Sequence, residues 1–164
     1  MATQKQLDTI YLRMARQFSL LSRAVRLKVG ALIVTPTGVI VPGYNGTPPG
    51  FDNECEYTDS NGNLVTKPDV IHAEMNAILK AARQGVSLLG STVYCTHAPC
   101  VNCAAKMAGI DFKRFVYQNQ YRDTSGIELL EQSGVSVEQI TDLHDRVNGR
   151  KVEHKYESRL HSEE

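Results

Sequence analysis

The sequence predicts an α/β protein with a three-layer α/β/α architecture, in which helices cover both faces of a mixed five-stranded sheet. Two observations carry this prediction. Helical and β-rich segments follow one another in the order α, β, β, α, β, α, β, α, β, and the later strands alternate with helices as parallel βαβ units do. The first two strands are separated by a short Pro/Gly turn, which indicates an antiparallel hairpin at one edge of the sheet.

The first half of the chain begins with an amphipathic helix over residues 4–22. Its apolar side chains recur in steps of three and four residues, at Leu7, Ile10, Met14, Phe18 and Leu21. The β-rich runs VGALIVT (29–35) and VIVPGYN (39–45) then predict the two strands of the hairpin. Residues 46–69 are rich in turn formers, and we expect a long loop there, of the kind that is functional or disordered in compact domains.

The second half of the chain alternates between helices and strands. Apolar periodicity and helix-ending glycines predict helices over residues 70–85, 99–109 and 125–134. The β-rich runs between them predict strands over residues 91–98, 112–120 and 135–140. One catalytic domain is thus expected over residues 1–141, followed by a highly charged tail, 142–164, that forms a solvated helix or is partly disordered.

The composition is that of an ordinary globular domain. Of 164 residues, 41% are apolar and 22% charged, and 18 Lys+Arg balance 18 Asp+Glu. This neutrality argues against a polynucleotide ligand, because non-specific nucleic-acid binding usually needs an excess of basic residues. No apolar run approaches the ~20 residues that span a membrane, and the N-terminus lacks a signal-peptide pattern. We therefore expect a cytoplasmic protein without a membrane partner, whose cysteines are metal ligands or core thiols.

Two short motifs at predicted helix starts indicate a catalytic zinc site. His72 and Glu74 lie in HAE at the start of one helix, and Cys100 and Cys103 lie in PCVNC at the start of the next. A CxxC pair alone is equally compatible with a redox or core thiol pair. H-x-E followed by P-C-x-x-C is the known signature of zinc deaminases, in which one imidazole and two thiolates leave the fourth coordination position open. The partial positive charge at helix starts also helps to keep thiolates ionised.

Glu74 is the candidate catalytic residue. It is two positions from His72, so the two side chains point in different directions and the carboxylate stays out of the metal's ligand set. A base placed in this way accepts a proton from water and passes it to a ring nitrogen of the nucleobase, and a second transfer releases the amino group as ammonia. One carboxylate therefore serves both proton transfers.

These residues resemble the cytidine deaminase-like superfamily, and three further stretches point to one family within it. GYNGTPPGF (43–51), HAEMNAI (72–78) and YRD (121–123) are similar to deoxycytidylate deaminases, over roughly residues 7–140. The resemblance implies that the protein hydrolyses dCMP to dUMP and so supplies thymidylate synthesis, with Zn²⁺ as its cofactor.

One zinc per chain is expected from the distribution of cysteines. Some deoxycytidylate deaminases hold a second, structural zinc through residues of the early helix and the long loop. Here the loop contains Cys55 but no histidine before His72, so Cys55 is expected to be an orphan thiol. Cys95 falls in a predicted strand and is expected in the core.

The resemblance also implies a set of substrate-binding residues, and the chemistry of a mononucleotide supports it. Asn45 offers a donor and an acceptor to a sugar hydroxyl, and Arg122 follows a strand on the side where ligands bind α/β sheets. Arg26 and Lys28 are possible phosphate partners, although ordinary surface charges are an open alternative for both. The expected substrate residues, with His97 as a wall of the base pocket, are Arg26, Lys28, Asn45, Ala73, His97, Tyr121 and Arg122.

Regulation and assembly are further implications of the resemblance. Many deoxycytidylate deaminases are oligomers that dCTP activates and dTTP inhibits, so we expect a homohexamer or another homo-oligomer, with Mg²⁺ accompanying a triphosphate effector. The expected effector residues lie after the second strand and on a polar stripe of the helix that begins at His72, namely Gly43, Tyr44, Gly46, Phe51, Asn76, Lys80 and Arg83. A solvated helix face is the alternative explanation of this stripe.

Two other functions are compatible with parts of the sequence. A tRNA adenosine deaminase shares HAE and PCxxC, but it would need a basic face for its polynucleotide. A non-catalytic, zinc-stabilised binding module would fill the fourth coordination position and would have no use for Glu74 as a proton carrier. Zinc analysis together with ammonia release from dCMP separates all three possibilities.

Overall fold

The computed structural model of the chain describes residues 1–144, 146–147 and 150–151. Its helices are α1 (Gln4–Ser19), α2 (Ala73–Gln84), α3 (Val101–Ala108) and α4 (Ser125–Gln132). Its strands are β1 (Gly30–Val34), β2 (Ile40–Tyr44), β3 (Glu56–Thr58), β4 (Leu64–Thr66), β5 (Thr92–His97), β6 (Arg114–Asn119), β7 (Ser136–Gln139), β8 (Arg146–Val147) and β9 (Arg150–Lys151).

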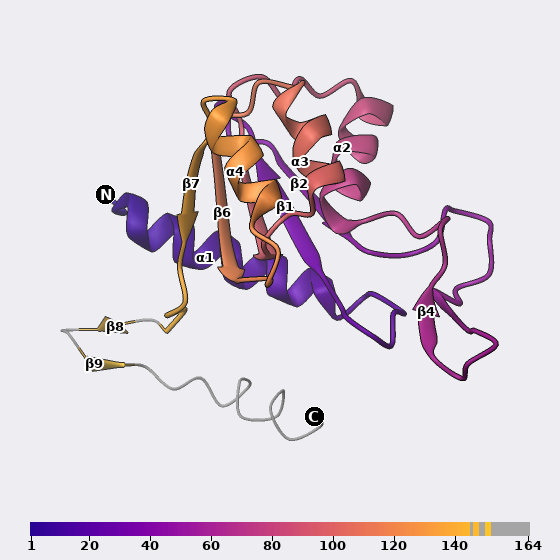
Figure 1. Ribbon diagram of the computed structural model, residues 1–164. Helices are drawn as coiled ribbons and strands as arrows, with labels where there is room; N and C mark the ends of the chain where they lie inside the picture. Colours follow the sequence, from indigo (N-terminus) through magenta and orange to yellow (C-terminus); the bar gives the residue numbers. More distant parts are fainter. Residues whose placement is uncertain (145, 148–149, 152–164) are drawn as a thin grey trace.

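Five of these strands form a mixed sheet with the spatial order β2-β1-β5-β6-β7. Strand β1 pairs antiparallel with β2 and with β5, whereas β5 pairs parallel with β6, and β6 with β7. Figure 1 shows α1 on one face of the sheet and α2, α3 and α4 on the other. The predicted three-layer α/β/α fold with a mixed five-stranded sheet is confirmed.

Side chains of the central strands alternate between the two faces of the sheet, and each face has its own apolar core. On the α1 side, Leu32, Tyr94 and Val116 pack with Leu12 of the helix. The larger core, under α2 to α4, includes Ala31, Ile33, Val93, Cys95, Met107, Phe115 and Tyr117. Because both faces are covered, β1 is apolar throughout, and the apolar residues of β5 and β6 are consecutive (93–95 and 115–117) instead of alternating.

Helix α1 ends at Ser19, earlier than the apolar pattern over residues 4–22 predicted. Leu21 continues the helical spacing but is 56% exposed. The next residue, Ser22, is buried, and its hydroxyl donates to the backbone carbonyl of Asn45 at 2.8 Å. This long-range bond turns the chain out of the helix and starts the segment that leads to β1.

A buried ion pair joins α1 to the sheet. Asp8 is 2% exposed, and its carboxylate accepts two hydrogen bonds from the Arg114 guanidinium, at 3.1 and 2.9 Å. The hydroxyl of Tyr94 donates to the same carboxylate at 2.7 Å. Burial alone would raise the pKa of Asp8, but hydrogen bonds from Arg114, Tyr94 and Gln4 lower it below its usual value. The carboxylate is therefore fully paired and fixes α1 against β5 and β6.

The long loop predicted over residues 46–69 contains a hairpin that the sequence analysis missed, formed by β3 and β4. The strands are too short to show a clear alternation of apolar and polar residues. Asp59 makes the turn, since its carboxylate accepts from the backbone N–H groups of Asn61 and Asn63 at 2.9 and 2.8 Å. At the base of the hairpin Cys55 is buried, and its carbonyl accepts from the Lys67 N–H.

The predicted charged tail, 142–164, falls mostly outside the described residues. Within it, β8 and β9 pair antiparallel, and Leu143 is buried in the core next to α1. The packed part of the chain therefore extends at least to this leucine. No helix in the described ranges is long and apolar enough to cross a membrane.

Strand β2 and helix α2 approach each other closely at Gly43. A Cβ built on Gly43 would lie 2.2 Å from the carbonyl oxygen of Ala73 and 2.6 Å from the backbone nitrogen of Ala77. These are backbone atoms of α2, so the helix itself would have to move. The small size of Gly43 is therefore required by packing against the helix that begins next to His72.

We expect Gly43→Ala to lower the free energy of unfolding by about 1–3 kcal/mol, the usual cost of overpacking a well-packed interface. Urea unfolding measures this loss. Gly46→Ala is the matched control, because a Cβ on Gly46 would meet nothing within 4 Å. Equal stability of the two variants would show that α2 tolerates the shift and that the contact is not a constraint.

Candidate metal centre and active site

The candidate site lies where the N-termini of α2 and α3 meet. His72 is the N-cap residue of α2, and its side chain makes no hydrogen bond to its own helix. Cys100 is the N-cap residue of α3, and its sulfur accepts from the backbone N–H of Cys103 at 3.4 Å. Both caps have extended backbone angles, so each side chain projects ahead of its helix. The sequence motifs thus become neighbours because both helix starts lie beside the same end of β5.

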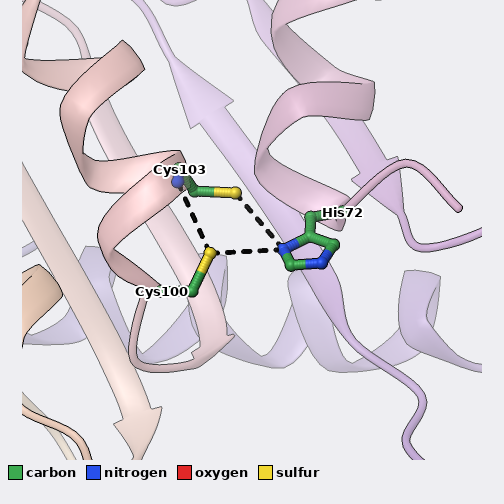
Figure 2. A group of neighbouring side chains, drawn as sticks. All are labelled: His72, Cys100 and Cys103. Atoms are coloured by element: carbon green, nitrogen blue, oxygen red, sulfur yellow. Dashed lines mark hydrogen bonds between the residues drawn. The ribbon is translucent and has the colours of Figure 1, made fainter. Parts of the chain in front are cut away.

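The three predicted metal ligands are brought together, as Figure 2 shows. The Nδ1 atom of His72 lies 3.5 Å from the sulfur of Cys100 and 3.3 Å from that of Cys103. All three ligand atoms lie within 4.8 Å of one another. A tetrahedral zinc with ordinary bond lengths would separate nitrogen from sulfur by about 3.6 Å. The residues therefore fit zinc in both donor type and spacing, with one coordination position left for a non-protein ligand.

The remaining two cysteines, Cys55 and Cys95, are not part of this group. Cys55 and Cys95 are buried free thiols, and burial raises the pKa of each. In the part of the chain that the structure describes, the His72, Cys100 and Cys103 cluster is the one group of histidine, cysteine and acidic side chains spaced to hold a metal. The expectation of one zinc per chain stays a prediction.

The two thiols of the cluster have opposite protonation tendencies. Hydrogen bonds from the Cys103 thiol and the His72 ring lower the pKa of Cys100 to about 3. The same hydrogen bond, given by Cys103, raises the pKa of Cys103. One thiolate is therefore present at neutral pH before metal arrives, and zinc binding must release the proton of the other.

Glu74 lies in the first turn of α2, beside the cluster, and its side chain is 4% exposed. Burial raises the pKa of its carboxyl to about 7. A carboxyl group in this range is able both to accept and to donate a proton at neutral pH, as a proton carrier must. The position predicted for the catalytic residue thus combines burial, closeness to the metal ligands and an adjusted pKa.

A cavity of about 450 Å³ opens beside the cluster, and most of the predicted substrate residues line it. The predicted residues in its wall are Arg26, Asn45, His72, Ala73, Glu74, His97, Cys100 and Tyr121. Lys28 and Arg122 are exposed and do not line it. Residues that the sequence analysis did not predict complete the wall, namely Ala24, Leu27, Val29, Glu56, Thr66, Val70 and Ala98.

His97 and Tyr121 form a flat aromatic wall in this cavity. Their rings are stacked, with centroids 5.6 Å apart and planes inclined by 25°. The Nδ1 atom of His97 is 2.8 Å from the hydroxyl of Thr96, which itself accepts from the backbone N–H of Gly30 at 3.1 Å. Burial lowers the pKa of His97, so the ring is neutral at neutral pH. A neutral, oriented pair of rings suits a planar heterocycle.

Asn45 has a structural task that the sequence analysis did not predict. Its side-chain oxygen accepts from the backbone N–H of Val29, and its side-chain nitrogen donates to the carbonyl of Leu27, both at 2.8 Å. These bonds hold the segment before β1 against the end of β2. One N–H of the Asn45 amide is left for a ligand, so the predicted contact with a sugar hydroxyl stays a prediction.

The predicted effector residues do not form one cluster. Lys80 lies 5.0 Å from the centroid of the Tyr44 ring and donates to the carbonyl of Pro42 at 3.1 Å, between α2 and β2. On the same helix face, the side-chain oxygen of Asn76 is buried and has no hydrogen-bond partner among the described residues. The others are separate: Gly46 pairs with Ile71, Phe51 is exposed, and Arg83 is exposed at the end of α2.

A three-layer α/β/α fold with His, Cys, Cys and a buried Glu at two helix starts defines a class of protein, the zinc deaminases of nucleobases. A model of the cytidine and deoxycytidylate deaminase zinc-binding region matches residues 5–119, so the chain belongs to this family.

Several relatives of the chain are named deoxycytidylate deaminase. The deoxycytidylate deaminase of phage T4 is 32% identical, with 71% of this chain and 80% of the phage protein covered. ComE operon protein 2 of Bacillus subtilis is 36% identical, with 79% and 69% covered. The Schizosaccharomyces pombe deoxycytidylate deaminase is 32% identical, and 80% of this chain matches 43% of it. The chain thus spans less than half the length of the yeast relative.

A solved structure is similar to the chain in both sequence and fold. The dCMP deaminase of cyanophage S-TIM5, crystallised with dCMP and dUMP, is 41% identical and superposes with a TM-score of 0.77. The match covers 85% of this chain and 100% of the phage chain.

Proposed function

We propose that the protein is a zinc-dependent dCMP deaminase, which hydrolyses dCMP to dUMP and ammonia. The observation that carries this proposal is the buried Glu74, placed beside a His–Cys–Cys set at a cavity large enough for a mononucleotide. The similarity to the phage enzyme that binds dCMP and dUMP supports the choice of substrate. A cytoplasmic location and a role in supplying dUMP for thymidylate synthesis follow from the same proposal.

The metal ligands and Glu74 have different roles in this reaction. Zinc, when bound by His72, Cys100 and Cys103, supplies the nucleophile by lowering the pKa of water towards ~7. Glu74 accepts the proton that the water loses and delivers it to N3 of cytosine. The water oxygen bonds to C4, and Glu74 then takes the proton of this new C4 hydroxyl group and gives it to the amino group. The C4–N bond breaks, so that ammonia leaves and C4 keeps the oxygen as the carbonyl of dUMP. Its pKa of about 7 suits both directions of transfer.

The other residues of the cavity bind and orient the nucleotide. The stacked rings of His97 and Tyr121 give the pyrimidine a flat wall. Arg26, at another part of the same cavity, supplies a cation for the 5′-phosphate. This division of a neutral aromatic wall and a cation fits a nucleoside monophosphate better than a free base.

A nucleotide panel tests the proposal. Purified protein with measured zinc content is incubated with CMP, dCMP, dCTP, deoxycytidine and dAMP, and ammonia release is followed. We expect dCMP to give the highest kcat/KM. Preference for an adenine nucleotide would favour a tRNA adenosine deaminase instead, and absence of turnover with one bound zinc would favour the non-catalytic module.

The phosphate contact can be tested with two arginine variants. We expect Arg26→Ala to raise KM for dCMP about ten- to hundredfold, the effect of losing a charge-assisted hydrogen bond, with a smaller effect on deoxycytidine. Arg122→Ala is the comparison, because Arg122 was predicted from the sequence but lies outside the cavity lining. A larger loss in Arg122→Ala would place the phosphate near YRD and remove it from Arg26.

Regulation and assembly belong to the same proposal. We expect a homohexamer or another homo-oligomer, activated by dCTP with Mg²⁺ and inhibited by dTTP, and Tyr44 and Lys80 are the effector candidates that lie together. Saturation curves with dCMP, measured with and without each nucleotide, test this part. Hyperbolic curves that neither nucleotide changes would exclude regulation without affecting the catalytic proposal.

A further inference from the structure

The hairpin of β3 and β4 contributes directly to the cavity wall. Glu56 and Thr66 face each other in its register, at the end where the two strands join the rest of the chain. Both residues line the cavity, as does Arg26. Figure 1 shows the remainder of the hairpin, labelled β4, projecting away from the sheet. The hairpin base is thus the part of this element that belongs to the candidate active site.

Glu56 holds the backbone of the segment between α1 and β1. Its Oε1 atom accepts hydrogen bonds from the backbone N–H groups of Val25 and Arg26, at 3.0 and 3.1 Å. This segment has no regular secondary structure, and Asn45 fixes its two ends, at Ser22 and at Leu27 and Val29, but not Val25 or Arg26. The conformation at Arg26 therefore depends on a carboxylate that comes from 30 residues further along the chain.

Thr66 holds the side chain of the same arginine. Its hydroxyl accepts from the Nη1 atom of Arg26 at 3.2 Å. Among residues 1–144, no carboxylate forms an ion pair with the Arg26 guanidinium within 4.0 Å. The guanidinium is thus anchored by a neutral group, which leaves its charge and its other N–H donors for an anion in the cavity.

We propose that Glu56 is a positioning residue for the substrate phosphate, acting through Arg26, with Thr66 as the second anchor. In the part of the chain that the structure describes, the Glu56 carboxylate accepts only from backbone N–H groups, and the neutral hydroxyl of Thr66 binds the Arg26 guanidinium. An ion pair at the guanidinium would compete with the phosphate, whereas this arrangement fixes the arginine and keeps its charge available. The inference rests on the proposed function, since it assigns the phosphate of dCMP to Arg26.

Steady-state kinetics of Glu56→Ala tests the proposal. We expect KM for dCMP to rise about five- to twentyfold, because two charge-assisted hydrogen bonds that hold Arg26 are lost, while kcat stays within about twofold. Glu56→Gln keeps an accepting oxygen and should give a smaller rise. Glu54→Ala is the matched control: it removes an exposed acid from the same hairpin region, one that lies 3.9 Å from Lys67 and not in the cavity wall.

A double-mutant comparison separates positioning from a general structural role. If Glu56 acts through Arg26, adding Glu56→Ala to Arg26→Ala should raise KM no more than about twofold further. An equal rise in both backgrounds, or a fall in kcat with unchanged KM, would overturn the proposal. If Glu56→Ala does not fold, Glu56→Gln and Thr66→Val in the two backgrounds decide the question. Failure of the proposed function is a distinct result, because the wild type itself would then not turn over dCMP.

Discussion

Glu74→Gln is expected to lower kcat for dCMP about 10²- to 10⁴-fold while the protein keeps its zinc. The amide has nearly the size of the carboxyl group, so it fits the same buried place in the first turn of α2. It is unable to carry a proton between water and the base. The zinc ligands are untouched, so the loss reports the proton transfers alone.

The experiment needs three measurements on one preparation: the rate of dUMP formation, the zinc content and the unfolding midpoint. Glu54→Gln makes the same chemical change at an exposed side chain and should leave all three unchanged. Wild-type activity in Glu74→Gln would contradict the role of Glu74 as the proton carrier. Lost zinc in this variant would instead show that the carboxylate supports the metal.

Cys103→Ala is expected to abolish both zinc binding and turnover. Two remaining protein ligands, His72 and Cys100, are too few for a tight site, since catalytic zinc sites use three protein ligands. The Cys103 side chain is 3% exposed and packed in the core under α2 to α4, so the loss of metal also removes a link between α2 and α3. We therefore expect a lower unfolding midpoint in the presence of zinc as well.

The matched control for Cys103→Ala is Cys95→Ala. Cys95 is fully buried in β5 and lies in the same core, but it is not part of the metal cluster. This variant makes the same deletion of a sulfur atom and should retain one zinc and the ability to form dUMP. A full complement of zinc in Cys103→Ala, or lost zinc in Cys95→Ala, would contradict the assignment of ligands.

The features that the sequence predicted correctly depend on local patterns. Apolar spacing predicted the four helices and β-rich runs predicted the five strands of the main sheet, because each element must bury one or two faces whatever its neighbours are. The cluster of His72, Cys100 and Cys103 was also predictable. Each ligand lies at or just after a helix start, and successive βα connections place helix starts at one end of a sheet. The short motifs were therefore sufficient to predict the three metal ligands and their closeness in the fold.

The features that the sequence analysis missed depend on contacts between distant residues. Glu56 is a single acid in a turn-rich stretch, and its function appears only when the hairpin places it against the N–H groups of Val25 and Arg26. Asn45 was predicted to bind a sugar, but it uses most of its polar atoms on Leu27 and Val29. Side chains that hold backbone groups have no periodicity, so no local pattern reveals them.

The rate of dUMP formation from dCMP as a function of bound zinc decides whether the protein is a zinc-dependent dCMP deaminase. Preparations that contain between zero and one zinc per chain are assayed under identical conditions. We expect a rate that is proportional to zinc content and reaches its maximum at one zinc per chain. Formation of dUMP by zinc-free protein, or none by protein that holds one zinc at His72, Cys100 and Cys103, would contradict it.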